Sequence, residues 1–220
     1  DILSEALDFI SKQRFFNWQV KFPGVWKELD KKEISGGFDA VIGNPPWDRI
    51  KMQKVEWFKA RRPEIALARR AADRNVMIAK LLESSDPLAK SFEEAIKQSE
   101  TATRVAKKSG EYPLLSGGDV NLYSLFVERS MVLIKPNGLS GLITPSGIAS
   151  DKTAAKFFKQ VASTGRLKAL YDFENRRTRY DRPKFFPEVD GRFKFCLFVA
   201  GSGAASEPAK CAFFLQDVKE

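Results

Sequence analysis

The chain has 220 residues, with 37 lysines and arginines against 28 aspartates and glutamates, and it contains no histidine. The missing histidine excludes a Ser-His-Asp triad, a Cys-His pair and a histidine metal site, and two cysteines are too few for structural zinc. This cysteine usage favours a reduced, cytoplasmic protein with no metal. The net charge of +9 favours a polyanionic partner, nucleic acid first. No apolar run approaches the roughly 18 residues that a membrane helix needs, so no membrane partner is expected.

The two ends of the chain do not resemble designed termini. The chain begins at Asp1 without a methionine or a signal segment, and it ends at Glu220 just after a strand-like run. We therefore expect these residues to be a fragment of a longer polypeptide.

The first 50 residues predict one helix and one strand. Residues 1–12 predict a helix, because one face collects Ile2, Leu3, Ala6, Leu7 and Ile10. The segment 15–26 is aromatic and irregular, and we expect its rings to lie in the core. Phe38–Gly43 is a nearly continuous apolar run, which is typical of a buried parallel strand, and Pro45-Pro46 ends it sharply.

Residues 51–110 differ in composition and predict several helices. The segment carries 14 basic and 8 acidic residues, and Pro63 and Pro87 are expected to separate its helices. A helical stripe is formed by Met77, Leu81, Leu88, Phe92 and Ile96. Two interpretations remain open for its charges: a solvated helical face, or a DNA surface that includes Lys51 and Lys54.

After Gly117-Gly118 the pattern alternates between helices and strands. The expected elements are a helix over Val120–Ile134, a strand over Leu139–Thr144, a helix from the N-cap Asp151 to Val161, and strands over Leu167–Phe173, Phe193–Ala200 and Ala212–Leu215. Strands that alternate with helices predict an α/β fold with an open, largely parallel sheet.

The tetrapeptide Asn44-Pro45-Pro46-Trp47 follows the first strand, where open α/β sheets bind ligands. Two acceptors, the Asn44 amide oxygen and the Pro45 carbonyl, could hold both hydrogens of a planar exocyclic amine and stabilise the positive charge that grows there during methyl transfer. Trp47 offers a flat surface for a base that has left the helix. The structural alternative is a Pro-Pro turn with a buried tryptophan.

A polar loop runs from Asn175 to Gly191. It is rich in basic side chains, namely Arg176, Arg177, Arg179, Arg182 and Lys184, with Tyr180 among them. Such a loop near a cleft could contact DNA phosphates, in particular through Arg176 and Arg177, or it could be an ordinary solvated loop.

The chain resembles the large restriction-modification adenine methylases of bacteria, of the type II/IIG-like kind. Asn44-Pro45-Pro46-Trp47 resembles motif IV of amino-methyltransferases that use S-adenosylmethionine. It is preceded by the aromatic lead-in segments 16–18 and 22–26. Further segments resemble other motifs in the family's order: 121–129 motif V, 141–147 motif VI, and 171–176 with 192–197 the region of motif VIII.

The resemblance implies roles for individual residues. The catalytic motif, Asn44 to Trp47, would hold and stack the target adenine, and Phe195, or else Phe193, would press on the other face of the base. Asn121 and Pro145 would lie near the cofactor, with Pro145 shaping the wall of the cleft.

One departure from the family limits what the chain can contain. The glycine-rich cofactor loop should precede motif IV, but the 43 residues before Asn44 hold no such turn. We therefore expect residues 1–220 to be a partial catalytic domain, the half of a Rossmann-like methyltransferase sheet from its fourth strand onward, with a helical insertion at 51–110. The missing amino-terminal half and a target-recognition domain would be its partners, and alone it would bind S-adenosylmethionine weakly or not at all.

The resemblance implies a bacterial enzyme that transfers a methyl group from S-adenosylmethionine to adenine N6 in double-stranded DNA, in a restriction-modification or phage-defence system. Two alternatives remain open. The same motif suits RNA adenine or a protein glutamine amide, because each presents a delocalised amine. A basic nucleic-acid-binding module without activity is the other alternative.

Overall fold

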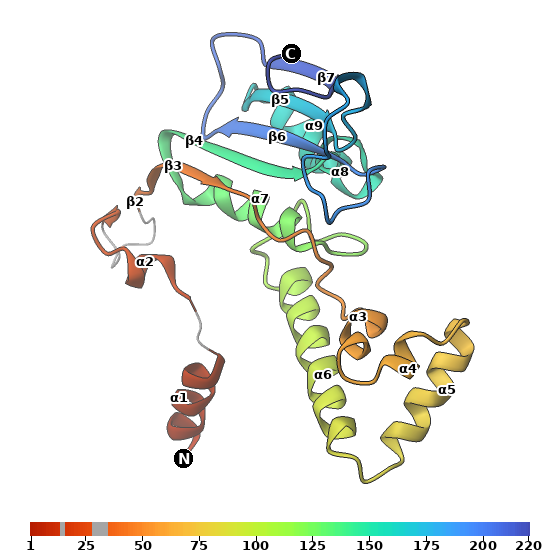
Figure 1. Cartoon of the computed structure of the whole chain (residues 1–220). Coiled ribbons are helices and arrows are strands. Elements are labelled where there is room, and N and C mark those ends of the chain that lie inside the picture. The colour runs from red at the N-terminus through yellow and green to blue at the C-terminus, as the bar shows by residue number, and fades with distance from the viewer. Residues whose placement is uncertain (14–15, 28–34) are drawn as a thin grey trace.

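A five-stranded sheet lies at one end of the molecule in the computed structural model, which describes residues 1–13, 16–27 and 35–220 (Figure 1). The strands lie in the order β3-β4-β6-β5-β7. Their bounds are Phe38–Gly43 for β3, Ile134–Pro145 for β4, Leu167–Glu174 for β5, Lys194–Gly201 for β6 and Lys210–Leu215 for β7. All five strands predicted from the sequence are present, β3 with the predicted bounds and the other four with shifted ends.

The sheet is mixed, so the expectation of a largely parallel sheet is wrong. β3 pairs with β4 and β5 pairs with β7 in parallel, whereas β6 runs antiparallel to both of its neighbours, β4 and β5. A parallel connection needs a crossover, usually a helix. Between β5 and β6 the described chain forms only a short 3-10 turn, Thr178–Tyr180, so the chain returns beside β5 in the opposite direction.

Two helices pack against one face of this sheet. They are α7, Leu122–Leu133, and α9, Ala155–Ser163. Their apolar side chains form a core with the strands, including Tyr123, Val127, Phe157, Val161 and Phe198. The prediction that Asp151 opens the second helix is wrong in detail. A short helix α8, Gly147–Ser150, and a 3-10 turn, Lys152–Ala154, come first, and the Asp151 side chain makes no cap hydrogen bond.

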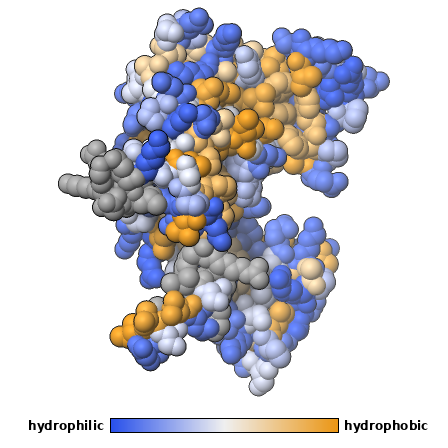
Figure 2. Space-filling model, turned by 90° about the vertical axis from the view of Figure 1, so that its left-hand side faces the viewer, coloured by the Kyte–Doolittle hydropathy of each residue, from blue (hydrophilic) through white to orange (hydrophobic). Residues whose placement is uncertain are grey.

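The edge strand β3 is less buried than its apolar sequence predicts. It has one described neighbour, β4, and the side chain of Ile42 is 86% exposed. Figure 2 shows hydrophobic side chains gathered over part of one side of the molecule. The start of β3 is covered, because Trp18, Phe22 and Trp26 meet the ring of Phe38 edge-on, with centroids 5.1–5.8 Å apart.

The amino-terminal segment contains the predicted helix and a short pair of strands. The helix α1 spans Ile2–Gln13, and a single helical turn, α2, spans Trp18–Lys21. The strands β1, Trp26–Lys27, and β2, Ser35–Gly36, pair antiparallel. Of the aromatic residues expected in the core, Trp26 is buried, Phe16 is 55% exposed, and Phe15 lies outside the described residues.

The segment after the Asn-Pro-Pro turn forms a helical arm that extends away from the sheet (Figure 1). Its helices are α3, Lys54–Lys59, α4, Pro63–Ala66, α5, Ala71–Leu82, and α6, Pro87–Lys108. Pro63 and Pro87 occupy first-turn positions of α4 and α6, which confirms that they separate helices. The arm has its own apolar core, which includes Phe58, Ile65, Ile78, Leu81 and Phe92. No helix in the described part of the chain is long and apolar enough to cross a membrane.

Candidate functional site

The Asn44–Trp47 turn lies directly after β3, at the carboxyl edge of the sheet. The Trp47 indole Nε1–H donates a hydrogen bond to Asn44 Oδ1 at 3.1 Å. Asn44 is exposed, Pro45 is buried, and Trp47 is partly buried against the sheet core. An amide oxygen has two lone pairs, so Asn44 Oδ1 can accept a second hydrogen bond from a ligand.

Backbone hydrogen bonds join this turn to the start of α7. The Leu122 N–H donates to the Asp48 carbonyl at 2.8 Å, and the Ile50 N–H donates to the Val120 carbonyl at 3.0 Å. Between them, Arg49 and Asn121 face each other in an antiparallel bridge. The structure therefore places Asn121, the predicted cofactor contact, beside the predicted catalytic turn, although the two lie far apart in the sequence.

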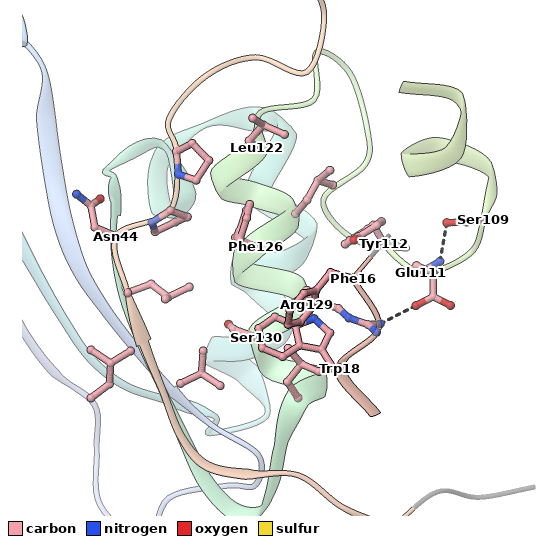
Figure 3. Close-up of a pocket in the computed structure, with 18 of the residues that line it drawn as sticks. Phe16, Trp18, Asn44, Ser109, Glu111, Tyr112, Leu122, Phe126, Arg129 and Ser130 are labelled. Carbon is pink, nitrogen blue, oxygen red and sulfur yellow. Dashed lines mark hydrogen bonds and ion pairs between the residues drawn. The ribbon is translucent and has the colours of Figure 1, made fainter. Parts of the chain in front are cut away.

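A cavity of about 920 Å³ opens between β3, α7 and the α6–α7 loop (Figure 3). Asn44, Pro45 and Pro46 line one end of it, and Leu122 and Phe126 of α7 form an apolar wall. In Figure 3 the Asn44 side chain points away from Phe126.

A single ion pair crosses the lining of this cavity among the described residues. Arg129 Nη1 lies 2.7 Å from Glu111 Oε2. Because this carboxylate already has a cationic partner, the cavity presents mainly apolar surface to a ligand.

Four aromatic rings connect the turn to the sheet. The ring of Phe186 lies 5.3 Å from Trp47 at 67° and 4.9 Å from Phe195 at 85°, so that Phe186 stands between them. Phe195 is 5% exposed and stacks on Phe173 at 5.3 Å. Phe193 is 58% exposed. The aromatic neighbour of Trp47 is therefore Phe186, which sequence reasoning missed, although an apolar Phe-Phe-Pro run inside a polar loop is a usable signal of burial.

Pro145, the predicted cleft wall, pairs with Phe195 across β4 and β6. One step inside the sheet, Thr144 Oγ1 lies 3.4 Å from the sulfur of Cys196. Burial raises the pKa of the Cys196 thiol to about 11, so this cysteine is a core residue and not a nucleophile.

The arginine-rich loop is largely neutralised by the carboxyl-terminal segment. Arg177 forms a buried ion pair with Asp217 and lies over the ring of Phe185 at 4.5 Å. Arg182 reaches the same carboxylate at 2.7 Å. The pKa of Asp217 is lowered by the Lys219 amide and by these arginines, despite its burial. Among the predicted DNA contacts of this loop, Arg176 is the exposed one, and its contact with phosphate stays a prediction.

The two lysines predicted to bind DNA lie at the start of the helical arm. Lys51 and Lys54 are both exposed, and Lys54 Nζ donates to Asn75 Oδ1 at 3.0 Å. Their role also stays a prediction.

A buried carboxylate on α7 was not anticipated from the sequence. Glu128 is 5% exposed, and its two oxygens accept the amide hydrogens of Leu114 at 2.9 Å and Leu115 at 2.8 Å. Burial raises the pKa of this carboxyl, while the two amides and Lys156 pull it down. Glu128 thus holds the loop that leads to Asn121. Glu111 and Tyr112 of this loop line the cavity. Within the described residues, no group of three metal-ligating side chains is placed to bind a metal.

A family model supplies the decisive comparison. The model for the Eco57I restriction-modification methylase family matches residues 2–73 and 92–178. The chain belongs to this family. The matched residues include the Asn44–Trp47 turn, Asn121 and Pro145, whereas Phe186, Phe193 and Phe195 lie beyond the matched range.

Solved structures with similar folds are distant from this chain. A putative class I S-adenosylmethionine-dependent methyltransferase from Listeria monocytogenes is 13% identical, with a TM-score of 0.39, and the match covers 84% of this chain and 38% of that one. The type ISP restriction-modification enzyme LlaGI, solved with a DNA substrate mimic, is 14% identical, with a TM-score of 0.40. The match covers 81% of this chain and 12% of that one. The chain solved in the DrdV–DNA complex is 14% identical, with a TM-score of 0.39, and the match covers 81% of this chain and 15% of that one. The match thus spans little more than a third of the length of the Listeria protein. A search of curated proteins found no match.

Proposed function

We propose that this chain carries the target-base site of a DNA adenine-N6 methyltransferase in a restriction-modification or phage-defence system. The family assignment supports DNA methylation in general. The observation that carries the finer proposal is the turn after β3, where Asn44 Oδ1 accepts the indole N–H of Trp47 and Pro45 follows directly in the chain. We also propose that the five strands belong to a Rossmann-like methyltransferase sheet, since this turn lies at the carboxyl edge beside the open edge of β3.

The chemistry of the turn suits an amine whose lone pair is delocalised into a ring. Asn44 Oδ1 and the Pro45 carbonyl would each accept one hydrogen of adenine N6, which turns the lone pair away from the ring and stabilises positive charge on the nitrogen. S-adenosylmethionine, when bound, supplies the activated methyl group. Neither acceptor is basic enough to keep a proton, so the proton that N6 loses goes to solvent.

Aromatic side chains would hold the base outside the duplex. Trp47 and Phe186, both partly buried, form the less buried end of the row of rings, and we assign them the stacking contacts with the flipped adenine. Phe195 lies behind Phe186 and supports it, and Phe193 remains the exposed alternative.

The chain offers a partial fit for the cofactor. The cavity beside Pro45 is large enough for a nucleoside, and its wall of Leu122 and Phe126 suits an adenine ring. Glu111, the one acidic side chain among the described lining residues, is paired with Arg129. Asn121 and Pro145 remain the proposed cofactor neighbours, and no catalytic step depends on them here.

Methyl transfer assays with labelled S-adenosylmethionine test the proposal. The intact protein is given duplex DNA, RNA and a glutamine-containing protein in parallel, and methylated nucleosides are identified by mass spectrometry. N6-methyladenine in DNA that disappears in Asn44→Ala but persists in Asn75→Ala supports the proposal. Product in RNA or protein alone, or DNA binding without transfer in any substrate, selects one of the two alternatives.

A further inference from the structure

Asn175 is a buried amide directly after β5, and two of the three hydrogen bonds of its side chain join the backbone of Phe186. Its side chain is 1% exposed. Oδ1 accepts the Phe186 N–H at 2.8 Å, and Nδ2 donates to the Phe186 carbonyl at 3.1 Å and to the Val189 carbonyl at 3.1 Å. The Asn175 backbone accepts the Phe185 N–H at 3.3 Å. One amide side chain therefore binds both polar groups of the Phe186 backbone.

These hydrogen bonds act on a segment that has little other regular structure. Between β5 and β6 the chain forms one 3-10 turn, Thr178–Tyr180, so no helix or strand ladder sets the direction of the Phe186 side chain. With its N–H and carbonyl both held, the Phe186 backbone has little rotational freedom, and the ring is directed to Trp47 at 5.3 Å.

Only an amide of this length satisfies all three partners. A carboxylate could accept from Phe186 N–H but has no hydrogen for the two carbonyls, and a hydroxyl has one hydrogen and is too short to reach both. The Phe186 carbonyl also accepts the Val189 N–H at 3.1 Å, and the Val189 carbonyl also accepts Lys184 Nζ at 2.8 Å. Loss of Nδ2 therefore takes one of two donors from each carbonyl, and a carboxylate in its place would turn an acceptor toward both of them. The hydrogen-bond partners at this position, and not its packing, therefore favour asparagine.

We propose that Asn175 is a positioning residue that fixes Phe186 against Trp47 and so shapes the aromatic wall of the target-base pocket. The part of this proposal that concerns the base rests on the proposed function. The part that concerns Phe186 and Trp47 does not.

The indole N–H resonance of Trp47 provides the test, because it reports the ring beside it. The chain has four tryptophans, so ¹⁵N-labelled intact protein shows four indole signals, and Trp47→Phe identifies one of them. We expect Phe186→Leu to shift this signal and Asn175→Asp to shift it in the same direction. Ser140→Ala is the matched control, since it removes a buried hydroxyl that is hydrogen bonded to Ser130 at 2.7 Å, far along the sheet.

The proposal is overturned if the Trp47 signal stays in place in folded Asn175→Asp, or if Ser140→Ala moves it equally. Should the Asn175 variants fail to fold, hydrogen exchange in the unmodified protein decides. The Phe186 amide is then expected to exchange at least tenfold more slowly than that of Glu188, and equal rates contradict the proposal.

Methylation separates this inference from the proposed function. If the Trp47 signal shifts in Asn175→Asp but the unmodified protein does not methylate DNA, Asn175 positions Phe186 and has no part in binding a target base. Methylation by the unmodified protein with an unmoved signal in Asn175→Asp removes Asn175 and leaves the proposed function intact. If the proposed function and the positioning role of Asn175 are both correct, we expect Asn175→Asp to raise the KM for DNA more than it lowers kcat. The reason is that the pocket wall loosens while Asn44 is unchanged.

Discussion

The indole Nε1–H of Trp47 donates a hydrogen bond to Asn44 Oδ1 at 3.1 Å. This bond orients the Asn44 amide, since an amide whose oxygen faces the indole must turn its NH₂ group away. The proposed acceptor and the proposed stacking ring thus form one unit. A change to either residue is expected to disturb both binding of the amine and stacking of the base.

Replacing Asn44 by alanine removes the side-chain acceptor for the target amine. We expect the methylation rate to fall by about 10²–10³, as for the loss of one preorganised electrostatic group. DNA affinity should change little, because phosphate contacts dominate it. Single-turnover rates and filter binding on the same preparations measure the two quantities. A variant that methylates at a near-normal rate would exclude Asn44 from catalysis.

The Trp47 side chain can be tested with a graded pair of substitutions. Trp47→Ala should weaken binding of the flipped base by roughly 1–3 kcal/mol, the usual value for stacking of one base. Trp47→Phe keeps a ring but loses the hydrogen bond to Asn44 Oδ1, so it should bind the base well and turn over more slowly. A fluorescent analogue at the target position reports the binding step. Equal fluorescence with and without the ring would make Trp47 a core residue only.

Lys51 and Lys54 test whether the start of the helical arm contacts DNA. Replacing both by glutamine should make the salt dependence of DNA binding shallower, by roughly 0.9 for each lost phosphate contact. Arg62→Gln is the control, because Arg62 is already paired with Asp86. If the double variant and the control give the slope of the unmodified protein, the charges of the arm form a solvated face.

Glu128 should contribute a pH-dependent component to stability. Its pKa is raised in the folded protein above the ordinary value of 4.5, chiefly by burial, so the native state holds the proton to higher pH than the unfolded chain. This component favours folding below the ordinary pKa and is lost as pH rises through the raised value. The free energy of unfolding is measured with urea across this pH range for the unmodified protein and for Glu128→Gln. The difference between the two curves should contain the pH-dependent component, because the variant lacks it. Two parallel pH curves would contradict the assignment.

Local patterns in the sequence determined the helices, the strands and the motif. Proline at the first helical turn and apolar periodicity predicted the arm, because both signals act within a few residues of each other, as at Pro63 and Pro87. The strand Phe38–Gly43 followed by Asn-Pro-Pro-Trp predicted where a site begins, since a strand, two stiff prolines and a polar side chain are contiguous.

Only the tertiary structure decided which distant residues meet. β6 pairs between β4 and β5 and runs antiparallel to both, because no crossover helix separates it from β5, and its choice of neighbours is not encoded in any local pattern. Phe186 reaches Trp47 because Asn175 holds its backbone, and Arg177 is occupied by Asp217 from the end of the chain. Asn175 and Phe186 lie 11 residues apart, and the other contacts join segments that lie tens of residues apart. Their partners are chosen by burial and hydrogen-bond geometry in the folded molecule, and not by the neighbours of each residue in the sequence.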